Sequence, residues 1–284
     1  MTFEEYDQQQ RQITAALAAV LLVILAPITL AALTTAGWIS LLHALFPHIE
    51  GGRRESAELA RRFFDAERAH HTGLPERHPV LLAGYQWDWF AEAMSILPAE
   101  LRDYPRHEDQ IARVISVALK EVENGGRSTL LRATRSDRPA GGWARVATGE
   151  QTCAFCLTMV SRGPAYFFAS DAGLDTDDTE AMDLYDQLVS ARTAQEKADA
   201  DEVLAELMTQ WHPNCDCRVV PVYNANWPGR EAHEAAEDLY GHAVRTHKGQ
   251  DAINAVRRVL YEQNKDAINA QRRATYARRT ASAA

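Results

Sequence analysis

The chain has 284 residues, of which 46% are hydrophobic, and it carries a formal net charge of −9. This length and composition suit one large folded domain or two small ones, and they exclude a chain that is disordered throughout. The negative charge argues against affinity of the whole surface for nucleic acid or anionic lipid, because phosphate binding depends on clustered Lys and Arg. Local basic patches can still override it.

The N-terminal stretch from Ile13 to Leu42 contains no acidic or basic residue. It is long enough to cross a bilayer core, so membrane contact of residues 13–42 is one interpretation. Against it, the preceding "MTFEEYDQQQRQ" is acidic rather than positively charged like the start of a signal peptide, and Pro27 splits the run. We favour a buried helical hairpin or a helix that faces another subunit.

The rest of the N-terminal region has a helical pattern. In "EDQIARVISVALKEVENGG" the apolar residues recur at helical spacing, and Gly125 is expected to end that helix. In "HIEGGRRES", Gly51 and Gly52 are expected to end one helix before another starts near Ser56. Further helices are predicted over "SAELARRFFDAERAH" and "WDWFAEAMSIL". Residues 1–135 are therefore predicted to form a helical N-terminal domain with a long apolar hairpin.

The composition changes in residues 136–230. "GGWARVATGEQTCAFC" is rich in Gly, Thr and β-formers, and "CRVVPVY" predicts a short strand before the turn "NANWPG". Between them, 12 Asp or Glu stand from Asp171 to Gln210, against two basic residues. The motif "DTDDTE" within this acidic segment lacks the Gly and the distal Glu of a calcium loop, so a solvated acidic segment is expected there. The predicted fold class is α+β, mostly α, with a small central β-containing Cys/His domain between two helical regions.

The C-terminal residues 231–284 are predicted to be basic helices. "DAINAVRR" at 251–258 recurs as "DAINAQRR" at 266–273, which places Ile253 and Ile268 on similar faces of a helix. From Gly241 to Ala284 there are nine Lys or Arg against three acids. Two interpretations of this basic segment remain open: it contacts DNA or an acidic partner, or it is simply a solvated helix end. The candidate nucleic-acid contacts are Arg257, Arg258, Arg272, Arg273, Arg278 and Arg279.

The four cysteines form two close clusters. Cys153-x-x-Cys156 places two thiols within one turn, which is a usual half-site for tetrahedral zinc, and His212-x-x-Cys215-x-Cys217 adds three further candidate ligands. Two close pairs are too few for a disulfide-stapled scaffold and indicate a reducing compartment. We predict a structural zinc site with the four cysteines as ligands. His212 either substitutes for one of them or hydrogen-bonds to one.

Two other chemistries would use the same residues. A redox C-x-x-C motif normally opens a helix in a thioredoxin-like unit, but "TCAFCLTMV" has no second strand and crossover around it. Cys153 or Cys156 with His212 would suit a thiol protease, although no orienting Asn or Asp motif is visible. The sequence also lacks HExxH, GxSxG and a Gly-rich phosphate loop. A metal site is therefore favoured over an enzymatic one.

The order of motifs resembles one known family. "GGWARVATGEQTCAFC", "SRGPAY", "HPNCDCRVVPVY" and "WPG" together resemble the phage Mu F-like head-morphogenesis proteins, in the version carried by tailed phages of actinobacteria. The likeness is strongest over residues 124–230 and looser in the N-terminal region, where residues 13–42 are more apolar than in similar proteins. The family pattern covers the metal candidates Cys153, Cys156, His212, Cys215 and Cys217 and the turn glycines Gly149 and Gly163.

This resemblance implies a minor capsid protein, present in a few copies beside the portal and the major capsid protein, that acts in head assembly, DNA packaging or ejection. The expected location is the virion, and the host cytoplasm during assembly, where thiols stay reduced. Some relatives of that kind are labelled capsid maturation proteases, so processing of head proteins is the enzymatic alternative. A membrane-anchored protein of prophage origin is a third hypothesis.

Overall fold

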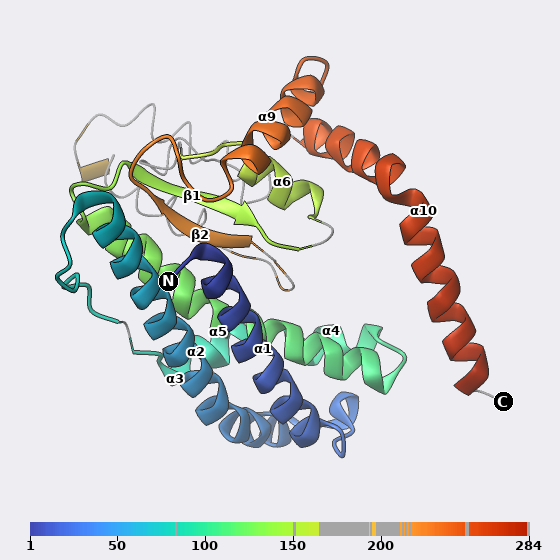
Figure 1. Cartoon of the computed structure of the whole chain (residues 1–284). Helices are drawn as coiled ribbons and strands as arrows, with labels where there is room; N and C mark the ends of the chain where they lie inside the picture. Colours follow the sequence, from blue (N-terminus) through green and yellow to red (C-terminus); the bar gives the residue numbers. More distant parts are fainter. Residues whose placement is uncertain are drawn as a thin grey trace.

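The computed structural model describes residues 1–82, 84–149, 152–164, 193, 195–196, 211, 213, 215, 217–247 and 250–282. The chain is α+β and mostly helical, with one two-stranded sheet, so the predicted fold class is confirmed (Figure 1). The acidic segment expected between Asp171 and Gln210 lies outside the described residues except at three positions. His212 also lies outside them.

The N-terminal region is a helical hairpin of α1 (Phe3–Leu25) and α2 (Thr35–Thr72), joined through a short 3-10 turn. Helix α1 begins with a capping box, because the Thr2 hydroxyl accepts a bond from the Glu5 amide and the Glu5 carboxylate accepts one from the Thr2 amide. The uncharged stretch therefore occupies the two arms and the tip of this hairpin. In the part of the chain that the structure describes, no helix combines the length and the apolar character that a membrane crossing requires.

Two of the predicted helix boundaries are wrong. Helix α2 runs straight through Gly51 and Gly52, and α5 (His107–Ser136) runs past Gly125. A β-carbon on Gly125 would lie 2.4 Å from the carbonyl oxygen of Arg53 in α2. The missing side chain thus lets the two helices approach closely, and Gly125 does not act as a helix stop.

A core joins the hairpin to the helices that follow it. Three short segments, α3 (Trp87–Ala93), α4 (Leu97–Glu100) and the 3-10 turn Leu101–Asp103, connect α2 to α5. Leucines spaced four residues apart on α1 face this core, as expected for an amphipathic helix. Its buried members include Leu17, Leu21, Leu25, Leu41, Leu45, Phe90, Ile111, Val114 and Val122.

The sheet pairs β1 (Gly142–Ala147) with β2 (Cys217–Val222) in antiparallel register. Both strands were expected from their β-forming residues, and all six residues of β2 are buried. The sheet packs against one end of the helices α1, α2 and α5 (Figure 1) and shares a core with them. Members of this core include Leu59, Phe63, Phe64, Leu130, Leu131, Trp143, Val146, Val219 and Val220.

Three further helices of the described residues pack together beside the sheet. Helix α6 (Ala154–Val160) follows β1, and α9 (Arg230–Val244) follows β2. Helix α10 (Gln250–Ser282) packs on α6 and α9 only through its first turns, where Ile253 and Val256 are buried. The remainder of α10 leads away from the other elements to the C-terminus (Figure 1).

Candidate metal centre

Three buried thiols lie together where β2 begins. Cys156 stands in the first turn of α6, Cys215 precedes β2, and Cys217 is the first residue of β2. Their sulfur atoms all lie within 4.8 Å of one another, and those of Cys156 and Cys215 are 3.5 Å apart. None of the chain's four cysteines, all of which are described, forms a disulfide. Three thiolates this close could bind a metal ion.

The fourth cysteine lies at the exposed edge of this group. Cys153 is the N-cap of α6, and its sulfur accepts a hydrogen bond from the Cys156 amide at 3.3 Å. Its thiol also hydrogen-bonds to that of Cys156. The structure thus brings the cysteines of both clusters together. The other predicted ligand, His212, lies outside the described residues.

Strand register explains how cysteines 59 residues apart in the sequence meet. Ala147, the last residue of β1, pairs with Cys217, the first of β2. The chain then needs only a short connection from Ala147 to reach Cys153 and the start of α6. Antiparallel pairing of two short strands therefore delivers both halves of the site to the same end of the sheet.

Two buried arginines pack beside the thiols, and sequence reasoning missed both. The guanidinium carbons of Arg127 and Arg145 lie 4.3 and 3.8 Å from the ring centroid of Trp211. Arg127 donates hydrogen bonds to the carbonyl oxygens of Cys215 at 3.1 Å and Cys217 at 3.3 Å. Arg145 is fully buried. The cluster thus lies in an enclosed environment in which the nearby positive charges favour a thiolate, whereas burial opposes one.

The pKa values of the clustered thiols are shifted in opposite directions. Hydrogen bonds from the thiols of Cys156 and Cys217 lower the pKa of Cys215, and the charge of Arg127 lowers it further. The pKa of Cys156 is raised by its hydrogen bonds to Cys153, Cys215 and Cys217. Cys215 is therefore the one of these three sulfurs that carries negative charge most readily, and the thiols of Cys156 and Cys217 donate to it.

A second set of buried charges ties the strand that carries Cys217 to the helices. Arg218 forms ion pairs with Asp7 of α1 at 2.8 Å and with Glu123 of α5 at 2.7 Å. Glu123 also pairs with Arg127 at 3.1 Å. The same carboxylate therefore links the Arg218 pair to the arginine beside the cysteines.

The candidate nucleic-acid residues all belong to α10. Arg257, Arg258, Arg272 and Arg273 are exposed. Arg278 and Arg279 lie in the last turns of the helix, and their side chains are outside the description. The four described arginines thus stand on a solvent-exposed helix, separate from the cysteine cluster.

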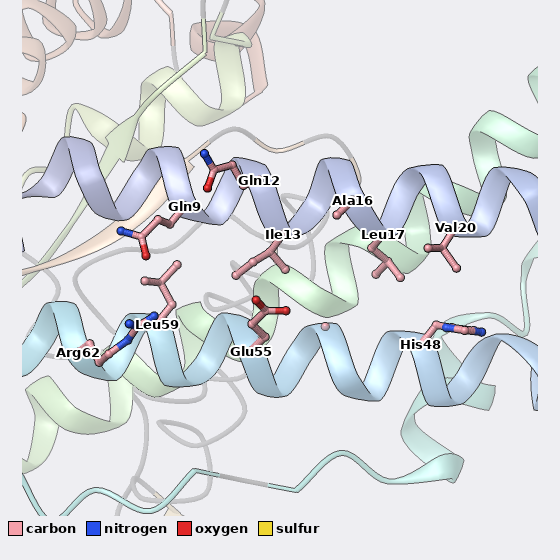
Figure 2. Close-up of a pocket in the computed structure, with 11 residues that line it drawn as sticks. Gln9, Gln12, Ile13, Ala16, Leu17, Val20, His48, Glu55, Leu59 and Arg62 are labelled. Carbon is pink, nitrogen blue, oxygen red and sulfur yellow. The ribbon is translucent and has the colours of Figure 1, made fainter.

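A separate groove of about 450 Å³ lies between α1 and α2. Figure 2 shows Ile13 and Leu17 pointing from α1 toward α2, and Leu59 and Glu55 pointing from α2 toward α1. The groove is lined by apolar and polar side chains in similar measure and involves no cysteine. It runs along one side of the α1–α2 hairpin and includes the charged residues Glu55 and Arg62. Contact of the hairpin with another subunit stays a prediction.

Comparison with known proteins gives consistent matches along most of the chain. The family model described as VG15 protein matches residues 1–243. The gene 15 protein of Mycobacterium phage D29 is 35% identical over 248 residues, which cover 81% of this chain and 88% of that protein. The gene 15 protein of Mycobacterium phage L5 is 35% identical over 287 residues, covering 92% of this chain and 95% of that protein. No solved structure matches.

Proposed function

The chain belongs to the VG15 protein family, with relatives in mycobacteriophages, and we propose that it is a minor structural protein of a phage head. The motif order that resembles the Mu F-like head-morphogenesis proteins supports a place in the head. Its partners would be the portal and the major capsid protein. It would act in the virion after assembly in the host cytoplasm.

Within this role, the cysteine cluster is proposed to hold one structural zinc ion. Zinc bound tetrahedrally at about 2.3 Å from each sulfur separates the sulfurs by about 3.8 Å, and the distance between Cys156 and Cys215 is 3.5 Å. Cys153 would complete the set of four, since its thiol already contacts Cys156. His212 would then hydrogen-bond to a ligand and not bind the metal itself.

The charges around the cluster support four thiolates. A divalent ion with four thiolates carries two net negative charges, which are costly to bury without compensation. Arg127 and Arg145 supply two positive charges beside Cys215 and Cys217. Both guanidinium groups pack on Trp211, so their positions are set before a metal binds.

Three of the thiols are buried in the core that the sheet shares with the helices. This burial is the main observation that favours a structural role for the metal site over a catalytic one. Cys156, Cys215 and Cys217 belong to the same core cluster as the sheet and the helices α2 and α5. A catalytic zinc keeps one position open for water or substrate, whereas four cysteine ligands leave none. Zinc here would fasten α6 to the start of β2 and so stabilise the sheet against the helices.

The proposed role is tested in phage particles. Cells infected with a phage that lacks the gene are complemented with the wild-type gene or with a Cys215→Ser variant, and purified particles are analysed by mass spectrometry. We expect the protein in wild-type particles at a few copies each, and defective heads without it. Absence of the protein from wild-type particles would contradict the proposal.

The same particles test the protease alternative. If the protein has a purely structural role, the other head proteins should have the same termini in wild-type particles and in any particles that form with the Cys215→Ser variant. Uncleaved precursors that accumulate with the variant, while the variant itself remains folded, would favour the protease and count against a structural role.

A further inference from the structure

The distal part of α10 is a basic helix that extends from the body of the protein. Its first turns are fixed by Ile253 and Val256, which pack on α6 and α9. Beyond Leu260, no described side chain of α10 is buried. We propose that this helix binds the phosphate backbone of double-stranded DNA without reading its sequence.

Charge sets this helix apart from the rest of the chain. Residues 250–282 hold seven Lys or Arg against three Asp or Glu, a net charge of +4, whereas the whole chain carries −9. From residue 267 to residue 282 there are four arginines and no acid. A positive helix on a negative body directs a polyanion to the helix, because the body repels it.

The basic residues also follow a regular spacing. Arg258, Lys265, Arg272 and Arg279 stand seven residues apart on the one continuous helix. A heptad spacing drifts by about 20° per step, so the four positions lie within about 60° of one face. With a rise of about 1.5 Å per residue they are about 10.5 Å apart and span about 32 Å. Lys265 pairs with Glu262 at 2.8 Å, which leaves the arginines as the main contacts.

The composition of the distal helix favours DNA over a protein groove. Helices that dock into protein grooves use apolar anchors at positions i, i+3 or i+4, and i+7. From residue 261 to residue 282 the large apolar side chains are those of Tyr261, Ile268 and Tyr276, and none of them has another three or four residues further on. Recognition must therefore rest on charge, and duplex DNA offers one negative charge about every 1.7 Å along its axis.

The exposure of the arginines also favours binding to DNA. Arg257, Arg258, Arg272 and Arg273 are all exposed, so they can reach phosphates without rearrangement of the fold. Arginine suits phosphate oxygens because its planar group donates two parallel hydrogen bonds. Phosphate contacts position a protein on a duplex and carry no sequence information, so binding is expected on any sequence. This inference stands apart from the proposed place in the head.

The test measures binding of the full-length protein to a fluorescein-labelled duplex of mixed sequence by fluorescence anisotropy, at salt concentrations from about 50 to 200 mM. The variant replaces four basic residues of α10 with glutamine: Arg258→Gln, Arg272→Gln, Arg273→Gln and Arg279→Gln. The matched control removes four exposed arginines elsewhere: Arg54→Gln, Arg102→Gln, Arg132→Gln and Arg135→Gln. Both variants have the same net charge, and circular dichroism checks that helix content is unchanged.

We expect the wild-type protein and the control variant to bind, with a dissociation constant that rises steeply with salt. Each phosphate contact contributes about 0.9 to the slope of log K against log salt, so the α10 variant should lose about 3 to 4 from that slope. A second variant with Lys at the four α10 positions should retain most of the wild-type slope.

Three results would overturn the proposal. The first is no binding of the wild-type protein at about 50 mM salt. The second is equal loss of binding in the α10 variant and the control. The third is displacement of the duplex by polyglutamate as effectively as by unlabelled DNA at equal charge, which would identify an acidic protein surface as the partner instead.

Discussion

Arg218 of β2 forms an ion pair with Glu123 of α5 across 2.7 Å, in a place where only 5% of the Arg218 side chain is exposed. The same guanidinium group pairs with Asp7 of α1 at 2.8 Å. One arginine from the strand that begins at Cys217 thus joins helices that lie more than 90 residues away in the sequence. The sheet that carries half of the metal site therefore depends on this charge for its position.

Replacing Arg218 should be strongly destabilising. The change Arg218→Met removes the partner that Asp7 and Glu123 share and leaves them only Arg11 and Arg127, so the cost should approach that of a broken buried ion pair, about 3 to 5 kcal/mol. Urea denaturation followed by circular dichroism measures the loss. The control is Arg77→Met, which breaks the exposed ion pair with Glu58 and should cost less than about 1 kcal/mol. Equal losses in the two variants would show that the buried pair does not support the fold.

The glycines of α2 and α5 should respond to alanine in opposite directions. Gly125→Ala forces a β-carbon against the Arg53 carbonyl and should destabilise the protein by about 1 to 3 kcal/mol. Gly51→Ala meets no atom within 4 Å and should stabilise α2 by about 0.5 to 1 kcal/mol. Thermal or chemical unfolding distinguishes the signs. A stabilising Gly125→Ala would contradict the close crossing of the helices.

Stability should fall at high pH because of Tyr6. Burial raises the pKa of Tyr6 to about 12, from an ordinary value near 10. Between these values the unfolded chain loses the phenolic proton while the folded chain keeps it, so rising pH favours unfolding. From about pH 9 to 11 the wild-type protein should lose about 1 kcal/mol more than a Tyr6→Phe variant. Parallel pH profiles for the two proteins would refute this.

Single substitutions should identify the fourth ligand of the metal. If Cys153 binds zinc, Cys153→Ser should weaken zinc affinity by more than about 100-fold, whereas loss of a neighbour that only orients a ligand costs about 10- to 100-fold. His212→Ala is expected in the weaker class. Competition with a chelator of known affinity measures both, and the reverse order would make His212 the ligand.

Local pattern was sufficient to predict most of the secondary structure. The apolar spacing from Ile111 to Val122 predicted the interior of α5, and the β-forming residues of "GGWARVA" and "CRVVPVY" predicted the two strands. The glycine positions were misread because a glycine that ends a helix and one that admits a neighbouring helix look alike in one sequence. Only the crossing partner, Arg53 for Gly125, tells them apart.

The candidate site was predicted only in part, because a single sequence shows local patterns and not the packing of distant segments. Cysteine spacing is a local signal, and it identified the thiols that the structure brings together. Arg127, Arg145 and Trp211 come from three separate segments, and no local pattern links them. Their joint position depends on strand pairing and on the packing of α5 against β2, which a single sequence does not reveal.

The metal content of the full-length protein, purified without a metal-binding tag, tests most directly whether the cysteine cluster holds a structural zinc ion. We predict one zinc per chain by mass spectrometry, retained through dialysis and absent from Cys215→Ser, together with a loss of stability when a strong chelator removes it. A folded, metal-free chain whose free energy of unfolding does not change when zinc is added would contradict a structural zinc site.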